Sequence, residues 1–173
     1  FAAIDRDCLS GLSGCGAITM PHASHLSGGL MFRVEDLDPT TAALRGELER
    51  LVEIFQHKGA SECRVGFGTT DELCAFERVD GGVADPARGS FVREALKEGL
   101  AYEESTGVNP FKLGFVGGTD THLATGAGAT VETSYMGHLG DPEDETLERL
   151  EPRVVDRNPG GLTVIWAEEN TRE

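Results

Sequence analysis

Lys112-Leu-Gly-Phe-Val-Gly-Gly-Thr-Asp-Thr-His122 decides the fold, because an apolar run here passes directly into polar residues that could bind a metal. Its apolar residues stand among glycines and predict a short buried strand that ends in a loop. Asp120 and His122 are two residues apart, so in extended backbone their side chains point the same way. A converging carboxylate and imidazole are typical ligands of a divalent cation. Asp-x-His is also common by chance, and a capping Asp beside a surface His fits equally well.

Helices and strands alternate on the N-terminal side of this stretch. Asp38-Pro39 has the form of a helix start, with apolar residues continuing at Leu44, Leu48 and Leu51. Ser90 is predicted to cap a second helix with an apolar stripe, which ends at a glycine. The remaining predicted strands are residues 17–22, 51–55 and 162–167. Alternating strands and helices predict an α/β fold with a mostly parallel sheet and helices outside, interrupted by long loop insertions at about 63–89 and 123–158.

Polar side chains stand at or near the ends of three predicted strands. His22 follows Pro21, a residue that suits the end of a strand, and Asp120 follows the glycine-rich strand. Glu53 is the one charge within Leu51–Phe55, and a buried carboxylate must be paired, protonated or bound to metal. Glu53 would instead face water if it belonged to the last turn of the preceding helix. In α/β barrels the chemistry lies at the carboxyl ends of the strands, so we expect these side chains to meet.

Composition narrows the classes of function. A net charge of -15 excludes a nucleic-acid backbone binder, which needs a basic surface. The sequence contains no run of 18 apolar residues, so it predicts no membrane span. The four cysteines have neither Cys-x-x-Cys spacing nor the density of a disulfide scaffold, so they do not indicate a compartment. The chain opens on Phe1 and closes in an acidic stretch with no room for a final helix, so we expect a fragment.

Four segments of the chain closely resemble a bacterial family catalogued as domain of unknown function 3604. They recur in the family's order from about residue 17 to the end of the chain. That family is similar to the PHP superfamily, the metal-dependent phosphoesterases named after polymerase and histidinol phosphatase. The segments are Met20-Pro-His-Ala-Ser-His-Leu-Ser-Gly-Gly-Leu-Met-Phe32, Leu51-Val-Glu-Ile-Phe-Gln-His-Lys-Gly-Ala-Ser-Glu62, Asn109-Pro-Phe-Lys-Leu-Gly-Phe-Val-Gly-Gly-Thr-Asp-Thr-His122 and Gly161-Leu-Thr-Val-Ile-Trp-Ala-Glu-Glu-Asn-Thr-Arg172.

The resemblance implies a partial (β/α) barrel of PHP type. Residues 1–173 would be the C-terminal portion of one such domain, with the N-terminal part and its further ligands absent. Two or three divalent metals (Zn, Mn or Fe) would lie on the barrel rim. Family members mostly have Asn where this chain has His25, so His25 is either a substitution or an added ligand. The positions that match the family's metal ligands are His22, Glu53, Asp120 and His122.

The function implied by such a site is metal-dependent hydrolysis of a small-molecule substrate, with phosphate esters favoured by the superfamily. Hydrolysis of an amide, ester or lactone bond and a non-catalytic metal-binding domain are the alternatives. His57 and Lys58 are candidates for contact with the substrate, although each also fits an ordinary surface group, and Glu168 and Glu169 are weaker candidates. We expect this chain alone to be inactive. Bacterial cytoplasm and periplasm both remain open, as do the oligomeric state and any part played by His138.

Overall fold

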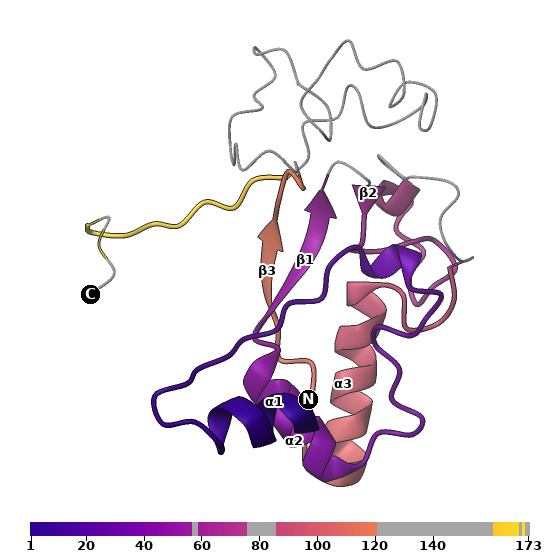
Figure 1. Cartoon of the computed structure of the whole chain (residues 1–173). Coiled ribbons are helices and arrows are strands. Elements are labelled where there is room, and N and C mark those ends of the chain that lie inside the picture. The colour runs from indigo at the N-terminus through magenta and orange to yellow at the C-terminus, as the bar shows by residue number, and fades with distance from the viewer. Residues whose placement is uncertain (57–58, 76–85, 121–160, 170, 172–173) are drawn as a thin grey trace, which may run out of the picture.

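The computed structural model of the chain describes residues 1–56, 59–75, 86–120, 161–169 and 171 (Figure 1). The elements lie in these ranges, and the site is built where the strands end. The helices are α1 (Ala2–Ile4), η1 (Asp5–Leu9), η2 (Ser24–Leu26), α2 (Pro39–Leu48), η3 (Glu72–Ala75) and α3 (Val92–Thr106), and the strands are β1 (Leu51–Gln56), β2 (Gly59–Ala60) and β3 (Gly114–Gly117).

The described strands form a three-stranded mixed sheet in the order β2-β1-β3. β1 pairs with β3 in parallel and with β2 in antiparallel orientation. The PHP-type barrel with a mostly parallel sheet was therefore a wrong prediction. β1 ends at Gln56 and β2 begins at Gly59, and a connection this short can join only antiparallel neighbours. Among the described strands, the pairing of β1 with the glycine-rich strand β3 is parallel, as the alternation of strands and helices favours.

Local sequence rules account for the start of α2 and the end of α3. The Asp38 carboxylate accepts hydrogen bonds from the backbone N–H groups of Thr40 and Thr41, each at 3.0 Å, so Asp38 is the predicted N-cap. The Thr41 side chain also donates to Asp38, and these bonds hold the pKa of the Asp38 carboxyl below its usual value. Gly107 ends α3 in the left-handed region at φ 80°, where glycine carries no Cβ penalty.

The start of α3 differs from the prediction. Phe91 is the N-cap and Ser90 makes no cap, because the Ser90 hydroxyl accepts from the N–H of Ala87 instead. The backbone carbonyls of Ser61 and Glu62 accept from the first two N–H groups of α3, at 3.1 and 2.9 Å. A helix start held by another segment needs no cap of its own, so α3 is fixed to the chain that follows β2.

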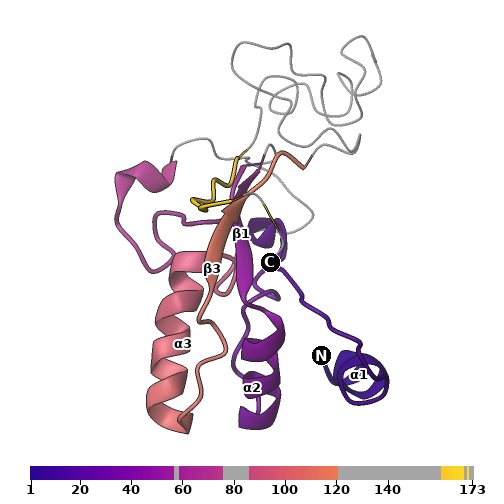
Figure 2. The ribbon, with the colours of Figure 1, turned by 90° about the vertical axis from the view of Figure 1, so that its left-hand side faces the viewer.

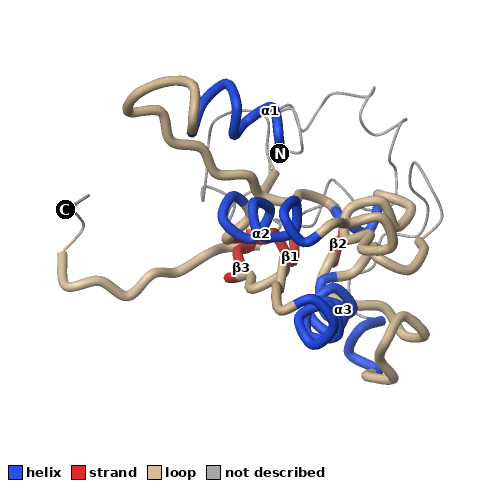
Figure 3. Tube along the Cα trace, turned by 90° about the horizontal axis from the view of Figure 1, so that it is seen from below, coloured by secondary structure: helices blue, strands red, loops and turns tan. Residues whose placement is uncertain are grey.

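The core is formed by side chains of β1, of α3 and of the two loops that carry Phe32 and Phe111. Figure 2 shows the upper end of α3 reaching the strands. Phe32 and Phe111 meet edge to face with ring centroids 5.6 Å apart, and both are 1% exposed. The guanidinium of Arg45 lies 4.7 Å from the Phe111 ring centroid and donates to Glu49 at 2.6 Å. Seen from below, α2 lies in line with β1 and β3, with α3 to one side (Figure 3). The fully buried core cluster consists of Phe32, Val52, Val92, Ala95 and Phe111.

Two predicted strands are absent, although both segments are described. Residues 17–22 are extended beside the start of β1, but Pro21 has no N–H to donate and Ile18 is 73% exposed. Residues 162–167 leave the end of β3 without pairing along it, and Trp166 is 96% exposed. A strand pattern becomes a strand only where a neighbouring backbone completes its hydrogen bonds. Among the described residues, residues 17–22 bond to other backbone only at Thr19 and Pro21, and no backbone pairs along residues 162–167. Leu100 of the predicted apolar stripe is likewise 64% exposed.

The two phenylalanines near β3 give a direct test of where the core lies. Phe111→Ala should lower the free energy of unfolding by about 3–5 kcal/mol, because it empties a fully packed position beneath Arg45. Phe115→Ala, at a side chain that is 52% exposed, should cost less than about 1 kcal/mol. Urea unfolding of both variants beside the wild type measures the difference. Equal losses would show that the core has been placed wrongly.

Candidate functional site

His22 is carried to the sheet by a segment that runs beside the start of β1. The N–H of Thr19 donates to the carbonyl of Leu48 at 2.9 Å, and the N–H of Glu53 donates to the carbonyl of Pro21 at 3.1 Å. These two backbone bonds fix the residues on either side of Met20, so the chain arrives at His22 in a defined position. The His22 side chain is 49% exposed, and its ring is accessible from solvent.

Glu53 approaches the same point from inside the sheet. It pairs with Val116 of β3, and the register shifts immediately afterwards, so that Phe55 pairs with Gly117. A bulge of this kind bends the strand and re-aims side chains, and bulges are frequent beside active sites. The Glu53 side chain is 7% exposed, which confirms the buried strand position and excludes the alternative of a solvated helix end.

The Glu53 carboxylate is satisfied by the His22 segment. Its Oε1 lies 3.0 Å from Nδ1 of His22 and accepts from the N–H of Ala23 at 3.3 Å. One buried carboxylate oxygen therefore holds both the ring of His22 and the turn that follows it. Hydrogen bonds of this type, with one ionised partner, are about twice as strong as neutral ones.

Asp120 follows β3, which ends at Gly117, and Figure 1 shows that β1 and β3 end at the same edge of the sheet. Its side chain is 12% exposed, and its Oδ1 lies 3.6 Å from Nε2 of His22. The single imidazole of His22 therefore lies between two carboxylates, with Glu53 at one ring nitrogen and Asp120 at the other. Sequence reasoning expected His22 and Asp120 to meet, and the structure brings them together.

Two residues with strained backbone flank the site. Ala23 has φ 46° and Asp120 has φ 53°, and they are the two non-glycine residues with positive φ in the described part of the chain. An Ala in this region is unfavourable, whereas Asp is more tolerant of it. Such conformations persist where surrounding contacts hold them, as the Glu53 bond to Ala23 does here, and they concentrate at functional sites. Neither strained position was foreseen from the sequence, which offers no signal for them.

The two contacts of His22 are chemically different. The Nδ1 distance of 3.0 Å to Glu53 is that of a hydrogen bond, so we assign the ring proton to Nδ1. The neutral ring then presents the lone pair of Nε2 toward Asp120. The arrangement pairs an acceptor nitrogen with a carboxylate oxygen, which a cation stabilises.

The pair formed by His22 and Asp120 suits a divalent cation. Metal–nitrogen and metal–oxygen bonds of about 2.0–2.2 Å allow two donors on one ion to lie 3.6 Å apart. Within the described residues, however, no group of three or more His, Cys, Asp and Glu side chains is arranged to hold a metal. The reason is visible in the geometry, because Glu53 faces Nδ1 and not the Nε2 side where Asp120 lies.

The remaining predicted site residues divide into two groups. His25 is 5% exposed and its Nδ1 lies 2.8 Å from the Ser61 hydroxyl, so it points into the protein. Glu168 and Glu169 are exposed at the far end of the segment that leaves β3. Four residues lie outside the described part of the chain and remain predictions: His57, Lys58, His122 and His138.

A comparison with known families places the chain. The family described as "Protein of unknown function (DUF3604)" matches residues 5–173 of the 173-residue sequence. The chain belongs to the DUF3604 family. No curated protein and no solved structure matches it. In the described part of the DUF3604 chain, no helix is both long enough and apolar enough to cross a membrane.

The assigned tautomer of His22 can be tested without any metal. In the DUF3604 chain, long-range ¹H–¹⁵N spectra of the imidazole rings should show the His22 proton on Nδ1. Glu53→Ala should lose this preference and lower the free energy of unfolding by about 1–3 kcal/mol, because the bond to Ala23 is also lost. Glu47→Ala, at an exposed carboxylate of α2, is the matched control and should leave the ring signals unchanged. A wild-type His22 protonated on Nε2 would contradict the assignment.

Proposed function

We propose that this chain contributes to the centre of a metal-dependent hydrolase, in which His22 and Asp120 hold a divalent cation such as Zn, Mn or Fe. The observation that carries the proposal is the position of His22, with Nδ1 3.0 Å from Glu53 and Nε2 3.6 Å from Asp120. A cation bound at Nε2 needs that nitrogen unprotonated, and the Glu53 contact keeps the proton on the other side of the ring. His122, outside the described residues, stays a predicted further ligand.

Glu53 has the part of an orienting residue in this proposal. Histidines that bind metals almost always donate their other ring N–H to a carboxylate or carbonyl, which fixes the ring and raises its basicity. Glu53 lies at that nitrogen and is itself held by the β1–β3 register. Glu53 was predicted to be a direct metal ligand, and the geometry supports an orienting role instead. Burial of the carboxylate strengthens its contact because little water competes for it.

The chemistry that such a centre offers is hydrolysis. A divalent cation bound there would supply a Lewis acid and an activated water at neutral pH. The chain's own residues would do the positioning: Asp120 contributes negative charge that retains the cation, and His22 contributes a neutral donor. The 49% exposure of His22 leaves the centre open to a small substrate from solvent. His57 and Lys58 take no part in holding the cation in this proposal, and both stay predicted substrate contacts.

Phosphate esters are the first substrate class of the proposal. The Met20–Phe32 and Asn109–His122 segments resemble the DUF3604 family, and support comes from the similarity of that family to the PHP phosphoesterases. The resemblance is an argument by analogy, and it concerns the chemistry of the site alone. An ester or amide bond without phosphate is the second candidate. The net charge of -15, together with two carboxylates at the site, favours an uncharged substrate unless the bound cations offset that charge.

Asp120→Asn is the variant that tests the proposal. It keeps the size of the side chain and removes the charge that retains the cation, so metal content and turnover should fall together by at least about tenfold. Elemental analysis gives the metal content, and chromogenic phosphate monoesters, phosphate diesters and carboxyl esters give turnover, each with added Mn or Zn and after chelation. Full-length protein that includes this chain should be used.

Asp36→Asn is the matched control, because Asp36 is an exposed carboxylate that pairs with Arg33 and not with a residue of the site. Its metal content and turnover should equal those of the wild type. If Asp120 is only a strand-end residue, Asp120→Asn should cost at most about 1 kcal/mol of stability and leave both readouts unchanged. That result would remove the metal site, and turnover of carboxyl esters alone would favour the second candidate.

A further inference from the structure

All four cysteines of the chain are paired. Cys8 bonds to Cys15 and Cys63 bonds to Cys74, with Cα–Cα distances of 5.2 and 5.3 Å, and no cysteine is free. Disulfides form and persist in oxidising compartments and are rare in reducing cytosol. The cysteine spacings alone match no motif that would indicate a compartment. The two pairs in the structure instead favour an oxidising compartment.

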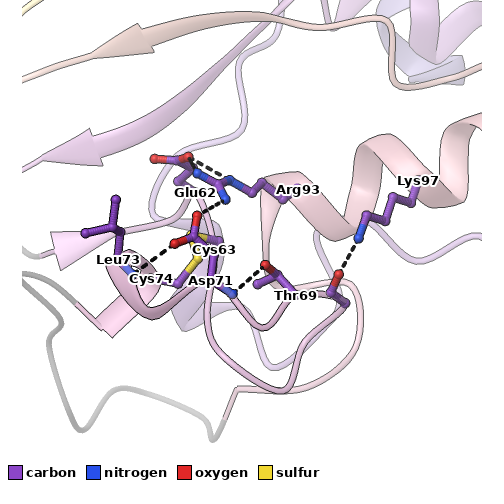
Figure 4. The surroundings of a disulfide bond; sticks show 9 residues. Glu62, Cys63, Thr69, Asp71, Leu73, Cys74, Arg93 and Lys97 are labelled. Carbon is purple, nitrogen blue, oxygen red and sulfur yellow. Dashed lines mark hydrogen bonds and ion pairs between the residues drawn. A yellow bond between two sulfur atoms is a disulfide. The ribbon is translucent and has the colours of Figure 1, made fainter.

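The two disulfides differ in what they hold. The Cys8–Cys15 bond joins η1 to the mostly exposed segment that follows it. Cys63 and Cys74 are 5% and 3% exposed, and their bond closes the loop between β2 and η3 (Figure 4). The second bond is therefore part of the packed interior, and its loop contacts α3.

Two carboxylates beside the disulfide bind α3. Glu62 directly precedes the loop closed by Cys63 and Cys74, and Asp71 lies within it. Glu62 accepts from Nε of Arg93 at 2.8 Å, and Asp71 accepts from Nη1 of the same side chain at 2.7 Å. Both carboxylates point at the guanidinium in Figure 4, where Lys97 also donates to the carbonyl of Gly68. The bond to Arg93 holds the pKa of the Asp71 carboxyl below its usual value. Without the disulfide, Asp71 would be tied to Glu62 only through the intervening residues of the loop.

Ser61 connects the disulfide to the segment that carries His22, through two residues of backbone on one side and a hydrogen bond to His25 on the other. Ser61, two residues before Cys63, is fully buried and contacts three parts of the protein. Its N–H donates to Ile54 of β1 at 2.8 Å, and its carbonyl accepts from Val92 of α3 at 3.1 Å. Its hydroxyl lies 2.8 Å from Nδ1 of His25. His25 stands three residues after His22, so the same turn is held at Glu53 on one side and at Ser61 on the other.

We propose that the Cys63–Cys74 disulfide is the oxidation-dependent anchor of the His22 turn, so that the site is assembled only in an oxidising compartment outside the cytosol. In forming the bond, each thiol gives up one proton and one electron. A low-molecular-weight or protein disulfide takes up the two electrons and two protons by thiol–disulfide exchange and leaves as two thiols. The link to metal binding rests on the proposed function, whereas the link to the position of His22 does not.

The test compares two double variants of the intact chain, Cys63→Ala with Cys74→Ala and Cys8→Ala with Cys15→Ala. Long-range ¹H–¹⁵N spectra report the rings of His22 and His25, and calorimetric titration with Mn²⁺ reports metal affinity. The first variant should shift both ring signals and weaken Mn²⁺ binding by at least about tenfold, as expected for loss of an outer support. The second variant should match the wild type in both readouts.

Ser61→Ala tests the same connection if the loss of Cys63 and Cys74 prevents folding. It retains both disulfides and removes the hydroxyl that contacts His25. The His22 and His25 signals should shift in the same direction as in the Cys63→Ala, Cys74→Ala variant. Unchanged His22 signals in either Ser61→Ala or the folded Cys63→Ala, Cys74→Ala variant would overturn the anchor. Free thiols in wild-type protein recovered from its native host under acid quench would overturn the oxidising compartment. Wild-type protein that binds no Mn²⁺ would refute the proposed function, while the ring signals would still decide the anchor.

Discussion

The parallel pairing of β1 with β3 is the constraint on which the rest of the structure depends. It places the ends of the two strands at one edge, so Glu53 and Asp120 approach the same point from different parts of the chain. The register shift after Glu53 falls at Ile54, whose backbone carbonyl accepts a hydrogen bond from the N–H of Ser61. A slip of one residue in this pairing would turn Glu53 to the opposite face and leave His22 without its partner.

The site is held under strain by contacts on both sides of one turn. Ala23, in the left-handed region, is fixed by Glu53, and His25 is fixed by Ser61, so His22 is positioned from two directions. The contact with His25 is buried and the contact with Ala23 is partly buried, so little water competes with them. A turn held in this way keeps the His22 ring in a single orientation, which a metal ligand needs and an ordinary surface histidine does not. The preorganisation extends to the disulfide loop through Ser61.

Sequence reasoning succeeded where the deciding physics is local. Asp38 and Gly107 mark helix ends because each satisfies backbone groups within a few residues of itself. Glu53 was recognised because a lone charge in an apolar run must find a partner. Prediction failed where a distant segment decides the outcome. Two residues, Gly59 and Ala60, are too few to indicate an antiparallel strand, and residues 162–167 have a strand pattern but pair with no backbone in the described part of the chain. The disulfides were missed because cysteine pairing depends on tertiary proximity. The proposed orienting role of Glu53 could not be predicted, because it depends on which ring nitrogen of His22 the carboxylate contacts.

The most direct measurement of the central claim is anomalous diffraction from crystals of the protein grown with Mn²⁺. The account predicts a single strong anomalous peak bonded to Nε2 of His22 and to the carboxylate of Asp120. Glu53 should remain hydrogen-bonded to Nδ1 on the far side of the ring. A peak bonded to Nδ1 with Glu53 displaced, or a fully occupied Mn²⁺ that touches neither His22 nor Asp120, would contradict the account.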